Sequence, residues 1–399
     1  METKNTTLFE ECGGLIKIIA ITGIRSEYDL LKPLLKALEA DSAFKLGIVV
    51  AGAHLTPLHD YSVRQIENDD FTIVERIENL IHSNSFLGKL KSTGLLIQGL
   101  GQVISREKPD LLIVIGDREE AIAGSLSGSY MSTPVVHIAG GDNTHPIGGN
   151  VDEEVRHATT KLSHIHLTMA EEFKQRVINL GEEPWRVFTV GSGGIDNLRT
   201  EKVADLDELS QVLGKDVFEN YLTLIHHPLN SQLEHTAEEM RVCLEACVQS
   251  GYKIFVGAPN SDPGFEDIAK VIDEYSNNKN VHIYRNLSRY DFVSLLRNSR
   301  CLVGNSSLAL HEAPFIGLPC VNVGERQRGR LADNNIQFVP VELNKIISAI
   351  KKAVNDENYR KSIGKESSPY GDGFMSEKSI KIIKALPNKK KLLAKKITF

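Results

Sequence analysis

Short apolar runs alternate with segments of helical periodicity along almost the whole chain of 399 residues. Such runs, bounded by turn residues, are typical of buried strands, and segments such as 27–40 and 119–130 repeat their apolar residues at helical spacing. Strands separated by helices pair in parallel, with helices on both faces of the sheet. The alternation therefore predicts an α/β protein. The predicted strands are residues 16–21, 45–50, 111–115, 135–138, 164–168, 187–190, 221–226, 253–258, 281–284, 301–303 and 320–323.

The chain is longer than one hydrophobic core usually supports, so we expect two domains. The glycine-rich stretch 191–194 marks the boundary between residues 1–192 and residues 193–375. Both domains are predicted to be doubly wound and Rossmann-like and to face each other across a central cleft. We expect the ligand-binding turns at this cleft, because ligands in such folds bind beyond the C-terminal ends of the strands. Two further helices are predicted, residues 199–213 at the start of the second domain and residues 377–385 capped by Ser376.

Charge and cysteine content limit the class of protein. The net charge of −6 argues against a nucleic-acid binder that relies on general electrostatics. The C-terminal lysines from Lys389 to Lys396 are interpreted as a solvated tail. The five cysteines lack the spacing of a metal site, and Cys243 and Cys247 are interpreted as packing residues of a helix. Without a signal peptide or an apolar run of about twenty residues, we expect a reduced, soluble, cytoplasmic protein that binds no membrane.

The segment after strand 301–303 reads Gly-Asn-Ser-Ser and continues into a helix-compatible stretch that contains Glu312. Backbone N–H groups and hydroxyls at a helix N-terminus suit phosphate oxygens. A carboxylate farther along accepts hydrogen bonds from the two neighbouring hydroxyls of a ribose. Ser306, Ser307 and Glu312 therefore indicate a site for a nucleoside diphosphate. A plain capped helix is the alternative, since Ser is a favoured N-cap.

Charged residues also follow two predicted strands of the first domain. Arg25 ends a Thr-Gly-Ile-Arg turn that lacks the GxGxxG pattern of a dinucleotide site, and it offers forked donors to a diphosphate. Asp117 is placed for proton transfer or for orienting a sugar hydroxyl, and Arg118 for phosphate. The alternative is a local ion pair at a helix N-terminus, which is our interpretation of Glu119 and Glu120.

The segment from residue 137 to residue 157 combines glycines with an unusual density of ionisable side chains. Arg156 lies one helical turn from Asp152 and is predicted to orient that carboxylate, while Glu153 or Glu154 is expected to face water. His164 and His166 alternate along a strand and are interpreted as packing or supporting residues rather than metal ligands. The ionisable residues of the segment are His137, Asp142, Asp152, Glu153, Arg156 and His157.

Three strand ends of the second domain carry polar residues. His227 precedes Pro228, which ends the strand, and Asn260 follows strand 253–258. Arg326 belongs to a loop, 324–330, that holds three arginines directly after an apolar strand. Together with the Ser306-Ser307 turn, this loop predicts an anion site.

These motifs resemble those of the UDP-N-acetylglucosamine 2-epimerases, and within that family the hydrolysing branch, which releases N-acetylmannosamine and UDP. The resemblance implies a GT-B fold, a C-terminal helix with a basic tail (residues 376–399) that crosses back to the first domain, and a homodimer or dimer of dimers. Non-hydrolysing members carry Gln-His-Arg in the place where this chain reads Ala51-Gly52-Ala53-His54-Leu55. The matching segments, in the order of the family, are 22–25, 116–118, 137–142, 152–157, 227–228, 304–307 with Glu312, and 324–330.

The resemblance also implies roles for single residues. Asp117, Asp142 and Asp152, helped by His157, would transfer protons, with base and acid unassigned among them. Many members have Glu where this chain has Ala139, so Asp142 or another acid would take that role. Neither a metal nor another cofactor is expected. The residues expected to hold UDP are Ser306, Ser307, Glu312, His227, Asn260 and Arg326 in the second domain, with Arg25 and Arg118 reaching the diphosphate.

Four alternatives stay open. The same reaction on a UDP-diacetamido-trideoxyhexose would use the same residues, because selectivity at C4 and C6 depends on pocket shape. A non-hydrolysing UDP-N-acetylglucosamine 2-epimerase would retain UDP on the product. A GT-B glycosyltransferase would not require the ionisable cluster from Asp142 to His157. A UDP-sugar sensor without turnover is compatible with Ala139.

Overall fold

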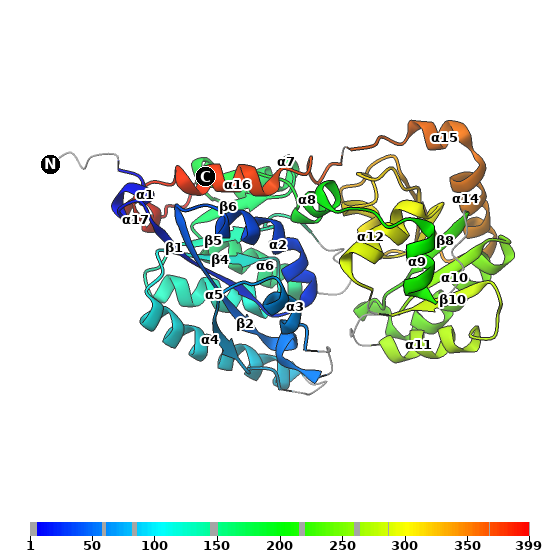
Figure 1. Cartoon of the computed structure of the whole chain (residues 1–399), viewed down its shortest axis with the longest axis horizontal. Coiled ribbons are helices and arrows are strands. Elements are labelled where there is room, and N and C mark those ends of the chain that lie inside the picture. The colour runs from blue at the N-terminus through cyan, green and yellow to red at the C-terminus, as the bar shows by residue number, and fades with distance from the viewer. Residues whose placement is uncertain are drawn as a thin grey trace. The chain divides into compact units, whose positions relative to one another are not determined.

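The computed structural model describes residues 6–57, 61–81, 86–143, 151–214, 220–258, 264–285, 287–366 and 368–398. These residues form two compact units (Figure 1). Unit 1 comprises the described residues within 6–143, 151–196 and 373–398, and unit 2 those within 197–372.

Unit 1 is built on a seven-stranded parallel sheet with the order β3-β2-β1-β4-β5-β6-β7. Every residue of β4 is buried, as expected for a central strand covered on both faces. The strands are β1 (Ile16–Thr22), β2 (Phe44–Ala51), β3 (Ile73–Ile77), β4 (Leu111–Ile115), β5 (Val135–Ile138), β6 (Ile165–Thr168) and β7 (Val187–Thr189).

Helices cover both faces of this sheet. Leu96 and Leu100 of α4 and Ala121 of α5 join one apolar cluster with Ile19 and Val49 of the sheet. Helices α2 and α16 contact each other on the other side (Figure 1). The helices are α1 (Leu8–Glu11), α2 (Arg25–Glu39), η1 (Gly52–Leu55), α3 (Val63–Asn68), α4 (Phe86–Glu107), α5 (Glu119–Tyr130), α6 (Val151–Leu162), α7 (Glu171–Asn179), η3 (Pro184–Arg186), α8 (Gly193–Thr200), α16 (Met375–Lys384) and α17 (Lys389–Leu393).

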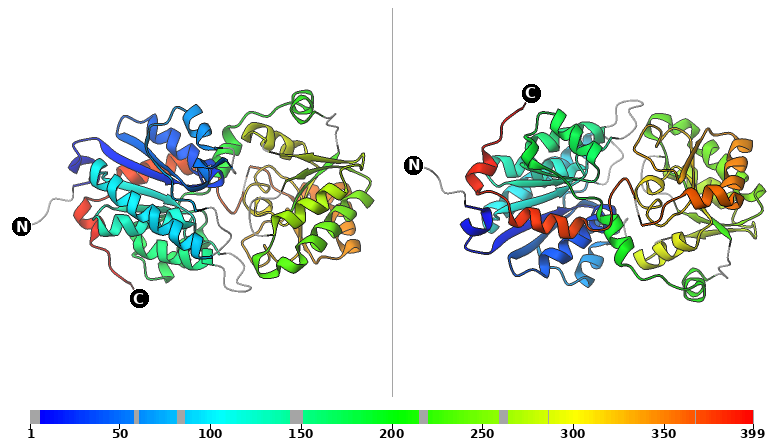
Figure 2. Two further views of the ribbon diagram at one scale, coloured as in Figure 1. Left: turned by 90° about the horizontal axis from the view of Figure 1, so that it is seen from below. Right: turned by 90° about the horizontal axis from the view of Figure 1, so that it is seen from above.

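The end of the chain returns to unit 1. Figure 2 shows α16 and α17, in red, lying along this unit beside its first residues. The N–H of Leu8 donates to the carbonyl of Leu386 at 2.8 Å, and Thr7 pairs with Pro387 in an antiparallel bridge. Both ends of the described chain therefore stabilise the same unit.

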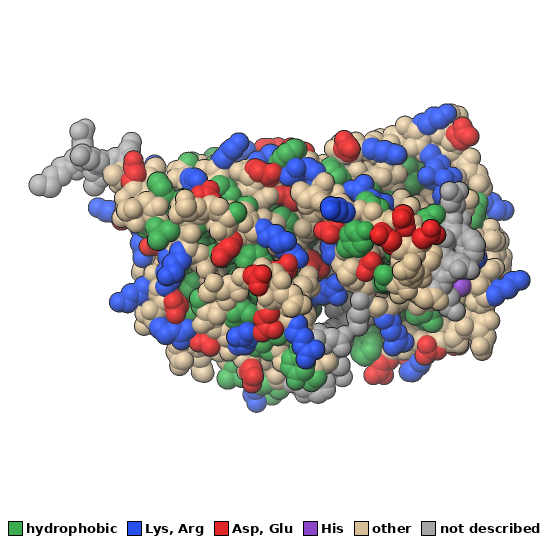
Figure 3. Space-filling view, in the orientation of Figure 1, with side chains coloured by type: hydrophobic (Ala, Val, Ile, Leu, Met, Phe, Trp, Pro, Cys, Tyr) green, Lys and Arg blue, Asp and Glu red, His purple; other side chains and the backbone are tan. Residues whose placement is uncertain are grey.

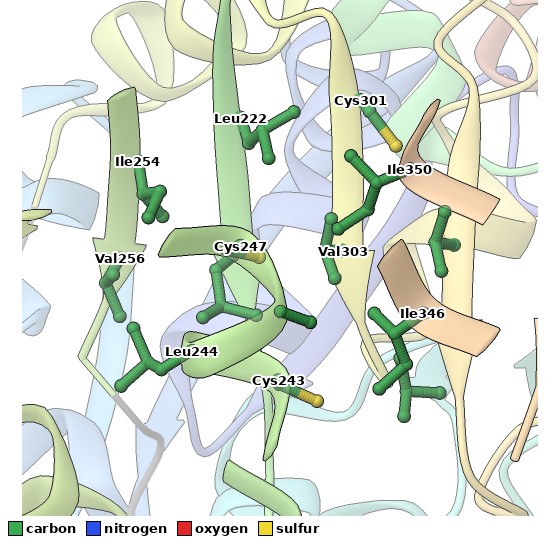
Figure 4. Packing of buried hydrophobic residues seen from close by; sticks show 14 of the residues in the cluster. Leu222, Cys243, Leu244, Cys247, Ile254, Val256, Cys301, Val303, Ile346 and Ile350 are labelled. Atoms are coloured by element: carbon green, nitrogen blue, oxygen red, sulfur yellow. The ribbon is translucent and has the colours of Figure 1, made fainter. Parts of the chain in front are cut away.

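Unit 2 repeats the scheme with a six-stranded parallel sheet of order β10-β9-β8-β11-β12-β13. Leu222 and Val303 of the sheet pack against Leu244 of α10 and Ile350 of α14 (Figure 4). The strands are β8 (Tyr221–Ile225), β9 (Lys253–Gly257), β10 (Val281–Tyr284), β11 (Cys301–Gly304), β12 (Cys320–Val323) and β13 (Ile336–Val339). The helices are α9 (Leu206–Leu213), η4 (Asn230–His235), α10 (Thr236–Gln249), α11 (Phe265–Glu274), α12 (Arg289–Asn298), α13 (Leu308–His311), α14 (Leu343–Asn355) and α15 (Glu357–Ser362).

The cysteines of this core are packing residues. Cys243 and Cys247 of α10 and Cys301 of β11 are buried in the same apolar cluster (Figure 4). Burial raises the pKa of the Cys301 thiol to about 12, so this thiol is protonated at neutral pH. The structure thus agrees with the interpretation of Cys243 and Cys247 drawn from the sequence.

Three expectations about local structure were wrong. The sheets contain two edge strands, β3 and β13, that the apolar pattern missed, because their partly exposed residues include charged and polar ones. The predicted helix 199–213 is two helices, α8 and α9, separated at Asp205, which caps α9. Ser376 is not an N-cap but lies within the first turn of α16.

The basic tail is also not fully solvated. Lys395 is largely buried against α6, whereas Lys390 and Lys396 are exposed. Acidic and basic side chains are interspersed on the face shown in Figure 3. Within the described residues, every helix is too short or too polar to cross a membrane.

Candidate functional site

Each sheet has one pair of neighbouring strands at which the strand order reverses, and ligands of open parallel sheets bind at that point. The pair is β1 and β4 in unit 1, and β8 and β11 in unit 2. The segments that leave the C-terminal ends of these strands are residues 23–25 and 116–118 in unit 1, and residues 226–227 and 305–307 in unit 2. Four motifs singled out in the sequence therefore flank the two reversal points.

Arg156 is the centre of the charged cluster in unit 1. Its side chain is only 4% exposed, and its guanidinium pairs with the carboxylates of Asp117 and Glu153. It also donates to the backbone carbonyl of Asp142 at 3.1 Å. A buried guanidinium requires such partners, so Arg156 ties α6 to the turn after β4. Helical spacing alone predicts Asp152 as its partner, whereas these contacts are with Asp117 and Glu153.

The other predicted acids lie around this pair. His157 Nε2 lies 3.2 Å from Glu153 Oε1, and Asp152 occupies the first turn of α6. Asp142 is buried in the loop after β5, where its Oδ1 accepts the N–H of Asn143 at 2.7 Å. Of the two residues from which a water-facing side chain was expected, Glu154 is exposed, whereas Glu153 contacts Arg156 and His157. Glu153 lies three residues before Arg156 and four before His157, and this helical spacing could have predicted both contacts.

His137 supports Asp117 from within the sheet. Its Nε2 lies 2.8 Å from the carbonyl oxygen of Gly116, which only accepts, so this nitrogen carries the proton. Its Nδ1 lies 3.3 Å from Thr160 Oγ1. Burial lowers the pKa of His137 to about 3, so the ring is neutral at physiological pH. His137 thus holds the carbonyl that precedes Asp117.

Two buried carboxyl groups, Glu27 and Glu120, lie at the turn after β1. Glu27 Oε2 accepts the N–H of Gly23 at 3.2 Å. A Cβ at Gly23 would lie 1.8 Å from Glu120 Oε1, so a larger residue here would displace the Glu120 carboxyl group. Burial, followed by the charge of Glu120, raises the pKa of Glu27 well above its usual range, and burial raises the pKa of Glu120 to about 6. The sequence interpretation missed this pair, because it took Glu120 only as a favourable charge at the N-terminus of a helix.

The two predicted diphosphate ligands of unit 1 stand on either side of its reversal point. Arg25 is the first residue of α2, and its Nε lies 3.7 Å from Asp29 Oδ2. Arg118 occupies the N-cap position of α5, and its charge opposes the pKa increases of both Glu27 and Glu120. Arg118 is therefore close to the buried carboxyl pair.

Ala139 has a strained backbone at the end of β5. Its φ of 65° lies in the left-handed region. Its N–H still continues the pairing with β6, because it donates to the carbonyl oxygen of Leu167 at 3.0 Å. Non-glycine residues in this conformation cost about 1 kcal/mol or more and cluster at functional sites. The turn that ends β5 is thus held in a costly conformation beside Asp142.

Asn305 organises the reversal point of unit 2. Its side chain accepts the N–H of His227 and donates to the carbonyl of the same residue, each at 2.8 Å. Its own carbonyl accepts hydrogen bonds from Arg326 at 3.1 Å and from Gln327 at 3.0 Å. Asn305 therefore joins the turns after β8 and β11 and brings the loop of Arg326 to them. The contribution of Gln327 was missed from the sequence.

Glu312 is held by an arginine that the sequence did not reveal. Arg289, at the start of α12, donates from Nη2 to Glu312 Oε2 at 2.7 Å, and both side chains are largely buried. Ser306 and Ser307 precede α13, which has only four residues, so its dipole is weaker than that of a longer helix. Glu312 follows this helix rather than lying within it.

The remaining sequence predictions lie outside the described residues. These are Asn260 and the glycines at 148 and 149 of the loop before α6. Within the described ranges, no group of three or more His, Cys, Asp or Glu side chains is arranged to hold a metal ion.

Comparisons with known proteins cover almost the whole chain. Residues 36–384 match the family model described as UDP-N-acetylglucosamine 2-epimerase. A hydrolysing UDP-N,N'-diacetylbacillosamine 2-epimerase from Legionella pneumophila is 34% identical over 379 residues, covering 95% of this chain and 98% of that protein. A UDP-N-acetylglucosamine 2-epimerase from Neisseria meningitidis is 30% identical over 337 residues, covering 84% of this chain and 87% of that protein.

The fold agrees with a solved structure. The crystal structure of a UDP-GlcNAc 2-epimerase from Neisseria meningitidis, bound to UDP-GlcNAc, matches with a TM-score of 0.73 at 20% identity. The match covers 92% of this chain and 99% of that one. The predicted α/β fold with two parallel sheets of the GT-B type is thereby confirmed.

Proposed function

The chain belongs to the UDP-N-acetylglucosamine 2-epimerase family, and from this premise we propose that it is a hydrolysing 2-epimerase. It converts a UDP-linked 2-acetamido sugar into UDP and the free sugar with inverted configuration at C2. The observation that carries the proposal is the Asp117–Arg156–Glu153 cluster beside the reversal point of unit 1. It combines carboxylates for proton transfer with a buried cation that orients them.

The reaction begins with an anti elimination. A carboxylate removes the proton from C2 while the bond between C1 and the UDP oxygen breaks, which leaves a 2-acetamidoglucal and UDP. In the α-linked sugar nucleotide, the C2 hydrogen and the leaving group are both axial, so the breaking bonds are aligned. We assign these proton transfers to Asp117, Asp142 and Asp152 with His157, and we add Glu153 because it shares Arg156 with Asp117. Base and acid stay unassigned among them.

The second half is an addition. Water adds its oxygen to C1, and C2 takes a proton from the face opposite to the one deprotonated. An acid that still carries its proton near neutral pH is needed for this step. Many family members have a Glu at the position of Ala139. Its role in proton transfer passes here to Asp142 or to another acid of the cluster.

We assign the UDP-binding groups to both sets of strand ends. In unit 2, His227, Ser306, Ser307, Glu312 and Arg326 bind the nucleotide, with Asn260 as a further ligand. Asn305 holds His227 and Arg326 in place. Arg25 and Arg118 of unit 1 bind the diphosphate. Arginines near the leaving group stabilise the charge that develops on UDP.

Hydrolysis rather than release of an epimerised UDP-sugar is supported by η1. The segment where non-hydrolysing members carry Gln-His-Arg holds His54, which is buried, with its ring nitrogens 3.1 Å from Thr22 Oγ1 and 2.8 Å from Ser62 Oγ. A side chain fixed in this way inside the unit is not available to a second nucleotide. The name of the relative from Legionella pneumophila agrees with this type.

For the substrate, UDP-N,N'-diacetylbacillosamine is the first candidate. It rests on the relative that is 34% identical over almost its full length. UDP-N-acetylglucosamine is the second candidate, supported by the relative from Neisseria meningitidis. The two differ at C4 and C6 and present the same C1 and C2 to the cluster, so the chemistry above serves both.

Incubation of the protein with each UDP-sugar in D₂O, followed by NMR, tests the proposal. Hydrolytic epimerisation gives free UDP and a free 2-epimer with deuterium at C2. Intact UDP-sugar with deuterium at C2 would instead identify the non-hydrolysing type. Binding of UDP without any exchange or release would favour a sensor. The ratio of kcat/KM for the two sugars, measured from UDP release, decides between the candidate substrates.

A further inference from the structure

The last residues of the chain are docked on unit 1 by a buried arginine. Arg186, which is fully buried, donates to the carbonyls of Leu392 at 2.8 Å and Ala394 at 3.2 Å at the end of α17. It also donates to the carbonyl of His164 at 3.2 Å, next to β6. These bonds place residue 395 at the end of α6.

Lys395 binds the C-terminal end of α6. Its ammonium group donates to the carbonyl oxygens of Lys161 and Ser163, each at 2.6 Å, and of Thr160 at 3.2 Å. The last carbonyls of a helix lack partners within the helix, and a cation also complements the negative end of the helix dipole. Lys395 therefore acts as the C-terminal cap of α6, supplied by a segment far away in the sequence.

A buried carboxylate completes this site. Glu182 is fully buried, and its oxygens lie 2.7 Å from Lys395 Nζ, 2.6 Å from Lys161 Nζ and 3.1 Å from His166 Nε2. The ionisable groups around it are Lys161 of α6, His166 of β6 and Lys395, and the charge of Glu182 also acts on His164. A neutral side chain at position 395 leaves the carbonyls of α6 uncapped and removes one cation from Glu182.

The other end of the same helix carries the proposed chemistry. Asp152, Glu153, Arg156 and His157 all belong to α6, and Arg156 reaches Asp117. The last turn of α6 is linked to Asp117 by a second route, because Thr160 contacts His137, which holds the carbonyl of Gly116. A shift of α6 along its axis therefore changes both contacts of the Asp117 turn.

We propose that Lys395 is a positioning residue that sets the place of α6, and with it the Arg156–Asp117 contact, for the epimerase reaction. The proposal rests on the proposed function of α6. It gives the basic tail a purpose other than solubility and distinguishes Lys395 from the exposed lysines around it.

The test compares Lys395→Met with Lys396→Met in the full chain. Lys396 is the matched control, because it is the same residue type one position away with an exposed side chain. Three quantities are measured: turnover as UDP release, the Kd of UDP, and amide hydrogen exchange of the peptide 151–162. Should Lys395→Met fail to fold by circular dichroism, Lys395→Gln replaces it under the same criteria.

We expect Lys395→Met to lower kcat about tenfold, with a Kd of UDP within twofold of wild type, since the nucleotide ligands assigned to unit 2 belong to other elements than α6. Amides 152–157 should exchange faster in this variant only. Unchanged turnover, unchanged exchange, or an equal loss in Lys396→Met would overturn the proposal. If the wild type releases UDP from neither sugar, the proposed function fails, while the exchange comparison still decides whether Lys395 holds α6.

Discussion

At the scale of single residues, the site of unit 1 depends on a buried arginine with carboxylate partners on two elements. Arg156 contacts Asp117 and Glu153, and removing one partner leaves the guanidinium with an incomplete set of acceptors. The Arg156–Asp117 contact therefore joins α6 to the turn after β4 and also holds the Asp117 carboxylate in a fixed orientation. Fixed orientation is what a proton-transfer group needs.

We predict that Asp117 of unit 1 acts in proton transfer and that Glu312 of unit 2 acts in UDP binding. We expect Asp117→Asn to lower kcat at least about 100-fold, because the amide cannot accept a proton, with the Kd of UDP changed less than threefold. Glu312→Gln should do the opposite, weakening UDP about tenfold, since the ribose hydroxyls lose a charged acceptor. Isothermal titration with UDP and steady-state UDP release measure the two effects. Equal losses of binding in both variants would contradict these roles.

Arg289 is predicted to act through Glu312. The 2.7 Å contact orients the carboxylate, so Arg289→Met should weaken UDP about five- to tenfold. The double variant with Glu312→Gln should bind no worse than Glu312→Gln alone, because both changes remove the same interaction. Titration of UDP against the wild type and the three variants gives the coupling. Additive losses would mean that Arg289 acts on its own.

At the scale of elements, helix ends in unit 1 are completed by distant side chains. Asp196 of α8 accepts the N–H groups of Met375 and Ser376, each at 2.8 Å, and also the hydroxyl of Ser376. Asp196 thus caps the first turn of α16 in place of the Ser376 cap expected from the sequence. Lys395 does the same for the last turn of α6.

Loss of the Asp196 cap should cost stability. Asp196 is buried, so Asp196→Ala takes the acceptor from the N–H groups of Met375 and Ser376, and we expect the free energy of unfolding to fall by about 2 kcal/mol. Urea unfolding followed by circular dichroism measures the change. Asp207→Ala, at an exposed acid in the first turn of α9, is the control and should change stability by less than about 0.5 kcal/mol. Equal effects in both variants would remove the special role of Asp196.

At the scale of the whole molecule, buried histidines couple folding to pH. Burial lowers the pKa of His137 to about 3 and that of His164 to about 4, and it also lowers the pKa of His166. An unfolded histidine binds a proton near pH 6.5. At these three positions the unfolded state therefore binds more protons than the folded state below that pH, so the histidine contribution to stability is complete above about pH 6.5 and is lost as the solution becomes more acidic.

We expect a net loss of stability, because these three histidines outnumber Glu27 and Glu120, two buried carboxyl groups whose raised pKa values let the folded state hold protons and oppose the loss. His137 and His164 each remove up to about 1.4 kcal/mol per pH unit once the pH lies below about 6.5 and above their own lowered pKa values, and His166 acts in the same direction. Below about pH 4.3, Glu182 adds to the loss, because hydrogen bonds from His166, Lys161 and Lys395 outweigh its burial and lower its pKa to about 2. Urea unfolding at pH 7.5, 6.5, 5.5 and 5.0 tests the prediction. A free energy of unfolding that stays constant from pH 7.5 to 5.0 would disprove it.

The fold class and the polar turns could be predicted from the sequence, because the patterns that specify them are local. The alternation of apolar runs and helical segments predicted parallel sheets, and the motifs at strand ends predicted which turns carry polar groups. In a parallel sheet, consecutive strands end at the same edge, so local motifs converge without knowledge of their distances. The edge strands β3 and β13 escaped because partial exposure breaks the continuous apolar run.

Only the tertiary structure decided which side chains meet. Arg156 and Asp117 are 39 residues apart, and Lys395 and Ser163 are 232 apart. The carboxyl pair of Glu27 and Glu120 and the Arg289–Glu312 contact likewise join separate elements. Spacing along a chain states which groups share a helix face, but the partner of a buried charge depends on desolvation and on the packing of distant elements. The sequence by itself determined the fold class, the family and the candidate groups. Tertiary packing decided how those groups are paired, protonated and held.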